Sequence, residues 1–417
     1  MKRAVVHVVG AGAGGLTAAR VLAASGRCDV ILHEASRHPG GRRRSFYDET
    51  LGLDIDTGNY PLISAWTAAR SLVEALGARG EWREAPEPGV AFADFAVGER
   101  WRLRPNVGRL PWWLLAPKRR GSHLSLADYC AGRRLLSAGA DATVASVAPG
   151  GAAMERLWRP LTLAALNCAP ETASARLAGA VLDELVRAGG DGLRILTPSE
   201  SFGRAFVDPL VRRLQRDGVT LRFERRLMAL EFESQRLAGL EFEHDRIDLG
   251  PRDALILATP WATAAALIPG SQAPSGFSAA LTVHYGAEPP PNAPAVVCAV
   301  NGPFDWLFAY RTRISVTIKD AAARLETPLE ALAAECWGAV AAVTGLSDVL
   351  PAWRVVVSRR AGCLSTPAEN ARRPACRTRW RNLLLAGGHV ESPLPDSLEA
   401  AVRSGETAAR AWLADGG

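Results

Sequence analysis

Long apolar segments, cysteine pairs and metal-binding spacings are all missing from this chain of 417 residues. No run of about 18 apolar residues occurs, and this excludes a membrane-spanning helix on length. The seven histidines are scattered and none falls into an HExxH spacing, so we expect no protein-bound metal. The seven cysteines are an odd number without a CxxC pair. Free thiols in a reducing compartment are the simpler interpretation, and we expect a cytoplasmic protein.

Lysine is also scarce, since only Lys2, Lys118 and Lys319 occur among 49 basic residues. The net charge of +6 suits an anionic membrane surface and nucleic acid equally well. No recognition helix or RNA-binding motif accompanies the charges, so we expect no nucleic-acid partner. With 48% hydrophobic residues, the chain can bury a large core, and its length suits two domains.

The N-terminal stretch is typical of a strand, a phosphate-binding turn, a helix and a second strand. Gly10 permits the tight turn, Gly12 lets the backbone approach a pyrophosphate, and Gly15 lets the helix pack closely on the strand. The free N–H groups of the helix N-terminus favour a diphosphate there. Glu34 ends the next apolar run, where its carboxylate can accept hydrogen bonds from both hydroxyls of a ribose. This pattern predicts a dinucleotide site but does not distinguish NAD from FAD.

The rest of the chain alternates between two kinds of sequence. Residues 61–199 show helical apolar spacing and no further βαβ unit, which predicts a substrate domain inserted into the nucleotide-binding domain. The last helix begins near Pro395, where Asp396 and Glu399 are spaced as a capping box. We expect helices at 154–167, 203–216 and 328–344, strands between 219 and 248, and a buried strand at 254–258. The predicted domains are nucleotide-binding at 1–60, 200–262 and 382–417, and substrate-binding at 61–199 and 263–381.

One segment of the predicted substrate domain, residues 101–120, combines apolar and cationic side chains. Trp112 and Trp113 are adjacent, with Arg109 before them and Lys118 after them. Indole rings beside cations suit the bilayer interface, and the alternative is a packed loop with a basic rim. We therefore expect a peripheral location at the inner face of the cytoplasmic membrane.

A second glycine motif follows Glu34 and identifies a superfamily. Glu34-Ala35, a short spacer and then Gly41-Arg42 resemble the second glycine motif of the amine oxidase and phytoene desaturase flavoproteins. The resemblance implies that Arg42 contacts the diphosphate of FAD, and that the turn around Gly58 returns the chain to the flavin. It also implies an α/β fold in which a Rossmann-like FAD-binding domain is interleaved with an α+β substrate domain.

Two further stretches narrow the resemblance to one branch. Trp158-x-Pro160-Leu161 with Asn167, and the stretch 394–405, look like the squalene-associated FAD-dependent enzymes, the hydroxysqualene dehydroxylases of bacterial hopanoid synthesis. The resemblance covers essentially the whole chain. It implies reduction of hydroxysqualene, a long isoprenoid, to squalene, and a functional link to squalene-pathway synthases.

The resemblance assigns three groups of site residues. Trp158, Leu161 and Asn167 are expected to bind substrate, and Tyr60 and His389 are candidates for the general acid, although each could equally be structural. The cofactor-binding residues are expected to be Gly10, Gly12, Gly14, Gly15, Glu34, Ala35, Gly41, Arg42, Gly58, Leu227, Gly387, Gly388, Ser397 and Leu398.

The sequence departs from the pattern of this branch at two places. The branch usually carries Gly-Asp-Trp before the last helix, whereas this chain has Gly387-Gly388-His389. The missing aspartate ordinarily contacts the sugar or diphosphate region of the cofactor, so flavin affinity is lower or water replaces the contact. Asn59-Tyr60 replaces an expected Gln-His, which weakens any transfer of a catalytic role to this turn.

Three other functions remain open at this point. A carotenoid-type desaturase or an amine oxidase would take hydride from its substrate instead of delivering it. The C-terminal motif has no cysteine for a covalent flavin link and no aromatic pair to frame an amine, which disfavours the oxidase. The third alternative is a non-catalytic prenyl-lipid binding protein of the same fold, which would purify without flavin colour.

Overall fold

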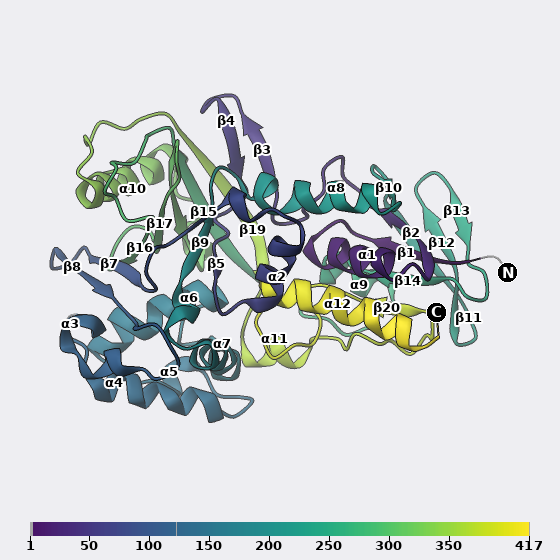
Figure 1. Cartoon of the computed structure of the whole chain (residues 1–417), viewed down its shortest axis with the longest axis horizontal. Coiled ribbons are helices and arrows are strands. Elements are labelled where there is room, and N and C mark those ends of the chain that lie inside the picture. Colours follow the sequence, from purple (N-terminus) through teal and green to yellow (C-terminus); the bar gives the residue numbers. More distant parts are fainter. Residues whose placement is uncertain (1–2, 122, 417) are drawn as a thin grey trace.

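Five parallel strands form the central sheet of one half of the molecule in this computed structural model, which describes residues 3–121 and 123–416 (Figure 1). The strands lie in the order β10-β2-β1-β14-β20. Their sequences are largely apolar because further layers cover both faces of the sheet. The strands are β1 (Ala4–Val9), β2 (Cys28–His33), β10 (Thr220–Arg222), β14 (Ala254–Leu257) and β20 (Leu383–Leu385).

Helices and a small antiparallel sheet form those outer layers. The helices α1 (Ala13–Ser25), α8 (Asp208–Arg216) and α12 (Leu398–Ala414) share one apolar core with β1 and β2, and Figure 1 shows α12 running alongside α1. A Cβ atom on Gly405 would lie 2.2 Å from the carbonyl oxygen of Gly14, so glycine lets α1 and α12 approach closely. A second core joins β14 and β20 to the small sheet of β11 (Leu227–Glu233), β12 (Arg236–Phe242) and β13 (Arg246–Asp248) and to α9 (Trp261–Leu267).

A larger mixed sheet of seven strands forms the other half of the molecule. Its order is β19-β15-β18-β17-β16-β7-β8, and α10 (Leu329–Thr344) packs on one face through Leu332, Cys336 and Trp337. All neighbouring strands are antiparallel except β16 and β7. The strands are β7 (Val90–Asp94), β8 (Glu99–Leu103), β15 (Phe277–Tyr285), β16 (Val296–Val300), β17 (Trp306–Ala309), β18 (Ile314–Ile318) and β19 (Trp353–Cys363).

A cluster of short helices lies beside this sheet and has its own apolar core, which includes Trp158 and Leu166. A π-helical turn at Met154–Trp158 leads into α6, as another at Gly203–Val207 leads into α8. The helices of the cluster are α3 (Pro117–Arg120), α4 (Leu126–Ala131), α5 (Val144–Val147), α6 (Arg159–Leu166) and α7 (Ala175–Ala188). The helices expected at 154–167, 203–216 and 328–344 are therefore present.

The prediction for residues 61–199 was incomplete, because this segment also contributes five strands. They are β7 and β8 of the large sheet and the small sheet of β5 (Leu62–Ile63), β6 (Trp82–Glu84) and β9 (Ile195–Pro198). Segments of two to five residues are too short for their periodicity to distinguish strand from helix. Leu72 and Trp82 also pack into the core of the nucleotide-binding half, together with α2 (Thr67–Ala75). The domain boundary near residue 61 stays a prediction, and this packing favours a later one.

The predicted capping box at the start of α12 is wrong by one residue. Ser397 is the N-cap, and its hydroxyl accepts a hydrogen bond from the Ala400 N–H at 3.1 Å. Glu399 instead accepts from the N–H groups of Ala68 and Ala69 at 3.0 and 2.8 Å and so caps α2. Asp396 does not cap α12 and instead forms an ion pair with Arg42.

Over the described ranges 3–121 and 123–416, no helix is both long and apolar enough to span a bilayer.

Candidate functional site

The first glycine turn lies at the carboxyl edge of the parallel sheet and has one open side. Gly10 has a φ of +110°, and a Cβ atom there would lie 2.5 Å from the carbonyl oxygen of Ala258. A Cβ on Gly15 would lie 1.9 Å from the carbonyl oxygen of Gly10, so both glycines are required by close packing. A Cβ on Gly12 would meet nothing within 4 Å. Gly12 is also the N-cap of α1 and provides no side-chain cap, so the helix N-terminus is left for an anion.

Glu34 ties this turn to the end of β2. One carboxylate oxygen accepts from the Ala11 N–H at 2.7 Å, and the other accepts from the Ser36 N–H at 2.8 Å. The backbone of Glu34 also accepts from the Arg225 N–H, which holds the start of β11, and with it Leu227, beside β2. Each carboxylate oxygen keeps a further lone pair, so the predicted ribose contact is compatible with these bonds.

The second glycine loop packs directly on the first. Gly41 has a φ of +60°, and a Cβ atom there would lie 3.2 Å from the Cα of Gly12. The Gly40 N–H donates to the carbonyl oxygen of Ala11 at 2.8 Å. The two motifs that the sequence assigns to the diphosphate are thus brought together, with Ala35 in the segment that connects them.

Arg42 extends from this loop to the start of α12, where it forms a two-pronged ion pair with Asp396. Its Nη1 and Nη2 lie 2.5 and 2.9 Å from the two carboxylate oxygens, and the guanidinium lies over the ring of Trp261. Asp396 also accepts from the Cys363 N–H at 3.1 Å. Burial by itself would raise the pKa of Asp396, but the charge and hydrogen bonds of Arg42 hold it well below its usual range. The Arg42 side chain remains 28% exposed, whereas that of Asp396 is 3% exposed.

Tyr60 and His389, the candidate acids, occupy different environments. The Tyr60 hydroxyl lies 2.9 Å from the Thr57 Oγ1 and donates to the carbonyl oxygen of Arg42 at 3.0 Å, and burial raises its pKa. A Cβ on Gly58 would lie 2.8 Å from this hydroxyl. His389 is buried, its Nε2 has no hydrogen-bond partner among the described residues, and burial lowers its pKa to about 4. At neutral pH both groups therefore carry no charge.

The remaining residues of the C-terminal motif support the start of α12. The Gly387 N–H donates to the Ser404 hydroxyl at 3.1 Å, and a Cβ on Gly388 would lie 2.0 Å from the carboxylate of Asp396. Leu398 is buried in the core of the nucleotide-binding half. The predicted flavin contacts of Ser397, Leu398 and the glycines stay predictions.

The three predicted substrate residues do not form one cluster. Trp158 is buried in the core of the short helices, where a Cβ on Gly132 would lie 2.0 Å from its ring, and Leu161 packs on the same core. Asn167 ends α6 with a φ of +49°, donates to the Ser278 hydroxyl at 2.8 Å and accepts from the Asp320 N–H at 3.1 Å. Its amide thus joins the helical cluster to the large sheet, and all three substrate contacts stay predictions.

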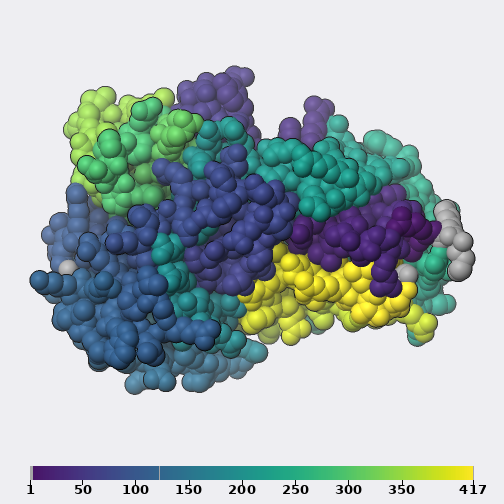
Figure 2. Space-filling model, viewed as in Figure 1, coloured from purple at the N-terminus to yellow at the C-terminus, as the bar shows by residue number. Residues whose placement is uncertain are grey.

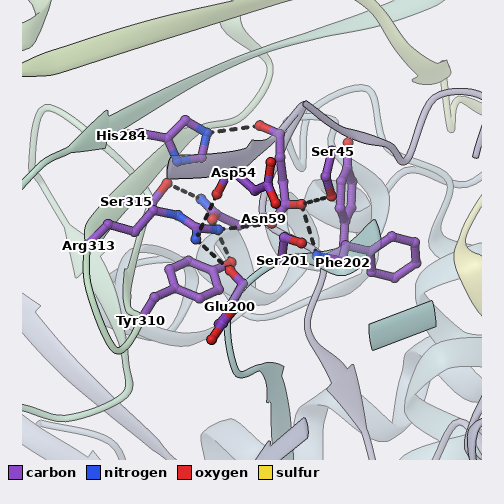
Figure 3. A network of polar contacts seen from close by, with 12 residues as sticks. Ser45, Asp54, Asn59, Glu200, Ser201, Phe202, His284, Tyr310, Arg313 and Ser315 are labelled. Carbon is purple, nitrogen blue, oxygen red and sulfur yellow. Dashed lines mark hydrogen bonds and ion pairs between the residues drawn. The ribbon is translucent and has the colours of Figure 1, made fainter. Parts of the chain in front are cut away.

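A buried polar network behind the turn at 54–60 was not expected from the sequence (Figure 3). The Arg313 guanidinium pairs with Asp56 at 3.0 Å, and the two side chains are 1% and 0% exposed. Asn59 donates to the hydroxyls of Ser315 and Thr317 and accepts from the Tyr310 hydroxyl. The partners are more than 250 positions apart, so no local pattern signals them. Asn59 therefore has a structural reason to differ from the family pattern.

Comparisons with known proteins agree with this arrangement. The family model described as flavin containing amine oxidoreductase matches residues 13–413. A hydroxysqualene dehydroxylase of Rhodopseudomonas palustris is 40% identical over 413 residues, which cover 99% of each chain. Another hydroxysqualene dehydroxylase, from Sinorhizobium fredii, is 38% identical over 98% of each chain.

Solved structures with the same fold include amine oxidases. A triple mutant of putrescine oxidase superposes with a TM-score of 0.74 at 16% identity and 99% coverage of both chains. The cyclohexylamine oxidase of Brevibacterium oxydans has a TM-score of 0.70, also at 16% identity and 99% coverage of both chains. The predicted family and fold are thereby confirmed. The chain belongs to the family of flavin-containing amine oxidoreductases and is an oxidoreductase with FAD as its cofactor.

Proposed function

We propose that this protein reduces hydroxysqualene to squalene in squalene and hopanoid synthesis. The observation that carries the proposal is the identity of 36–40% over nearly the whole chain to three proteins named hydroxysqualene dehydroxylase. The motifs around Trp158 and Pro395 support the same branch. The desaturase and lipid-carrier alternatives lack any comparable observation.

The reaction exchanges a hydroxyl group for a hydride, so one C–O bond breaks, one C–H bond forms and water leaves. Bound FAD supplies the hydride when reduced. The chain must supply a proton or a strong hydrogen bond to the departing hydroxyl, and an apolar surrounding that keeps water from the developing cation. Arg42 and the N-terminus of α1 supply the positive field for the diphosphate.

Of the two candidate donors, His389 is the better one. The Tyr60 proton is already donated to the carbonyl oxygen of Arg42, whereas the Nε2 of His389 has no partner among the described residues. With a pKa lowered to about 4, His389 is neutral near pH 7 and offers a hydrogen bond instead of a full positive charge. We expect His389→Gln to lower turnover more than Tyr60→Phe does, measured as squalene formed per flavin.

The direct test is an anaerobic incubation of the purified protein with FAD, dithionite and hydroxysqualene, followed by mass spectrometry of the products. Squalene in the complete mixture, and none without reductant, is the expected result. Dehydrogenation of phytoene under oxidising conditions, without any squalene, would favour the desaturase. Purified protein that neither carries nor takes up flavin would favour the lipid carrier.

We further propose that residues 104–120, here called the tryptophan loop, contact the membrane surface. Four large apolar side chains of this loop are between 61% and 68% exposed: Val107, Leu110, Trp112 and Leu115. Four cationic residues of the same loop are also exposed: Arg104, Arg109, Lys118 and Arg119. The last residues of the loop form α3, in the blue region that Figure 2 shows at the opposite end of the molecule from the N-terminus. A substrate dissolved in lipid would then enter without crossing water.

The two adjacent tryptophans have different positions. Trp113 packs edge-on against Tyr129 with ring centroids 5.2 Å apart, and only Trp112 is exposed. We therefore expect Leu110→Ser with Trp112→Ser to weaken flotation with vesicles of phosphatidylglycerol and phosphatidylcholine. Val349→Ser, at a 73% exposed apolar position outside the loop, is the matched control. Equal flotation of both variants and the unaltered protein would remove the role of the loop.

A further inference from the structure

We propose that Asp396 takes over the place of the aspartate that this chain lacks at position 388, and that it holds Arg42 in position for the flavin diphosphate. Asp396 is in this view a positioning residue of the cofactor site. The inference rests on FAD binding, and it is independent of which substrate is reduced.

Position 388 has no room for a side chain. The φ of Gly388 lies outside the left-handed region, so its backbone conformation does not require glycine. The surrounding space does require glycine, because a Cβ atom would lie 2.0 Å from the Oδ1 and 3.0 Å from the Cγ of Asp396. A side chain at 388 and the carboxylate of Asp396 therefore exclude each other. The carboxylate of Asp396 occupies the space beside position 388, and Asp396 lies at the other end of the loop 388–396.

The loop between positions 388 and 396 is held by hydrogen bonds from one arginine. Arg373 donates hydrogen bonds to the carbonyl oxygens of Gly388 and Val390 at 2.5 and 2.7 Å, and to that of Leu394 at 2.7 Å. One guanidinium thus fixes the loop from Gly388 almost to Asp396. The Cys363 N–H then holds the Asp396 carboxylate from the end of β19.

Asp396 fixes the side chain of Arg42. Both of its terminal nitrogens are bound by Asp396, and the Trp261 ring supports the guanidinium from one face. An arginine that is fixed before the ligand arrives loses less conformational entropy on binding. Because the side chain keeps 28% of its surface exposed, it can still contact an anion beside the Gly12–Gly41 contact. Asp396 thereby connects the N-terminal and C-terminal halves of the cofactor site.

The test is a set of four proteins: the unaltered chain, Asp396→Ala, Gly388→Asp, and the double variant that carries both changes. FAD affinity is measured on apoprotein by quenching of flavin fluorescence, and apoprotein melting is followed by circular dichroism. We expect Asp396→Ala to weaken FAD binding by about tenfold, because the freed Arg42 side chain must then be ordered when FAD binds. Gly388→Asp alone should weaken binding and lower the melting temperature, because two carboxylates then compete for one place.

The double variant decides the question. It should bind FAD more tightly than either single variant and melt above Gly388→Asp, because the carboxylate returns to position 388 without a clash. Asp396→Asn keeps the shape at 396 and should give an intermediate affinity. Gly139→Asp, at an exposed glycine with open space around it, controls for a new aspartate. A folded Asp396→Ala variant with unchanged affinity, or a double variant no better than Gly388→Asp, would overturn the inference. Neither result would affect the proposed reaction.

Discussion

Two arginine–aspartate pairs are connected to the turn at 54–60, and they differ in how completely they are buried. The Arg313–Asp56 pair is closed on all sides, with both side chains at most 1% exposed. In the Arg42–Asp396 pair only the aspartate is closed off, because Arg42 keeps part of its surface open. The turn contacts both pairs, since Asp56 belongs to one and Tyr60 donates to the backbone of Arg42.

The difference in exposure between Arg42 and Arg313 indicates which arginine can contact a ligand. Burial raises the pKa of Asp56 to about 6 in spite of Arg313 and of hydrogen bonds from Ser45 and the Phe202 N–H. The pKa of Asp396 is lowered instead, because the paired charge of Arg42 outweighs burial. The closed pair joins the turn at 54–60 to the start of β18 in the large sheet. A pair with an open arginine can also bind an anion.

The largest effect is expected from breaking the closed pair. Arg313→Met leaves the Asp56 carboxylate buried without its cation, and such losses cost about 3–5 kcal/mol. Urea unfolding followed by circular dichroism measures the difference. Arg311→Met is the control, because Arg311 pairs with Glu200 at the surface and should contribute less than about 1 kcal/mol. Equal destabilisation by both variants would contradict the distinction between closed and exposed pairs.

Breaking the open pair should act mainly on the cofactor. We expect Arg42→Met to raise the FAD dissociation constant by about tenfold or more, because a charge-assisted contact with the diphosphate is lost. The apoprotein should be destabilised less than by Arg313→Met, since water reaches the open side. Fluorescence titration with FAD and urea unfolding of the same samples give both values. Unchanged FAD affinity, together with a larger loss of stability than in Arg313→Met, would show that the Arg42–Asp396 pair serves stability and not cofactor binding.

The smallest effect concerns a histidine that accompanies each pair. His284 donates to the carbonyl oxygen of Asp56 at 2.9 Å, and burial lowers its pKa to about 3. Burial lowers the pKa of His389, near Asp396, to about 4. Both histidines are neutral in the folded protein, while the unfolded chain takes up protons below about pH 6.5. The stability they contribute is thus present above that pH and is lost as pH falls from about 6.5 toward 4.

Each histidine should account for about 1 kcal/mol of the stability lost between roughly pH 7 and pH 5.5. We expect His389→Gln and His284→Gln each to reduce this loss by a similar amount, measured by urea unfolding of the apoprotein at both pH values. His244→Gln, at an exposed histidine, is the control substitution. A pH dependence that neither buried substitution alters would show that both side chains are protonated in the folded state.

The parts of the fold and site that local patterns encode could be predicted. Gly15 is needed for its close contact with Gly10 and Gly41 for its contact with Gly12, and Glu34 follows a strand whose apolar run can be recognised in the sequence. The strands β5, β6 and β9 were missed because runs of two to four residues carry no decisive period.

The two arginine–aspartate pairs could not be predicted, because their partners lie 354 and 257 positions apart. At Asp396 the spacing to Glu399 even favoured a different role, since a capping box is a local pattern and an ion pair with Arg42 is not. Gly388 was recognised as a departure from the family pattern. Its cause became visible only when the fold placed Asp396 against it.

Hydride delivery from this flavoprotein to its substrate can be followed on the flavin itself. The flavin of the purified protein is reduced anaerobically, excess reductant is removed, and the sample is mixed with hydroxysqualene while the absorbance near 450 nm is followed. We expect the oxidised flavin band to return without oxygen and one squalene to form per flavin. A band that returns only when oxygen is admitted, with hydroxysqualene recovered unchanged, would contradict it.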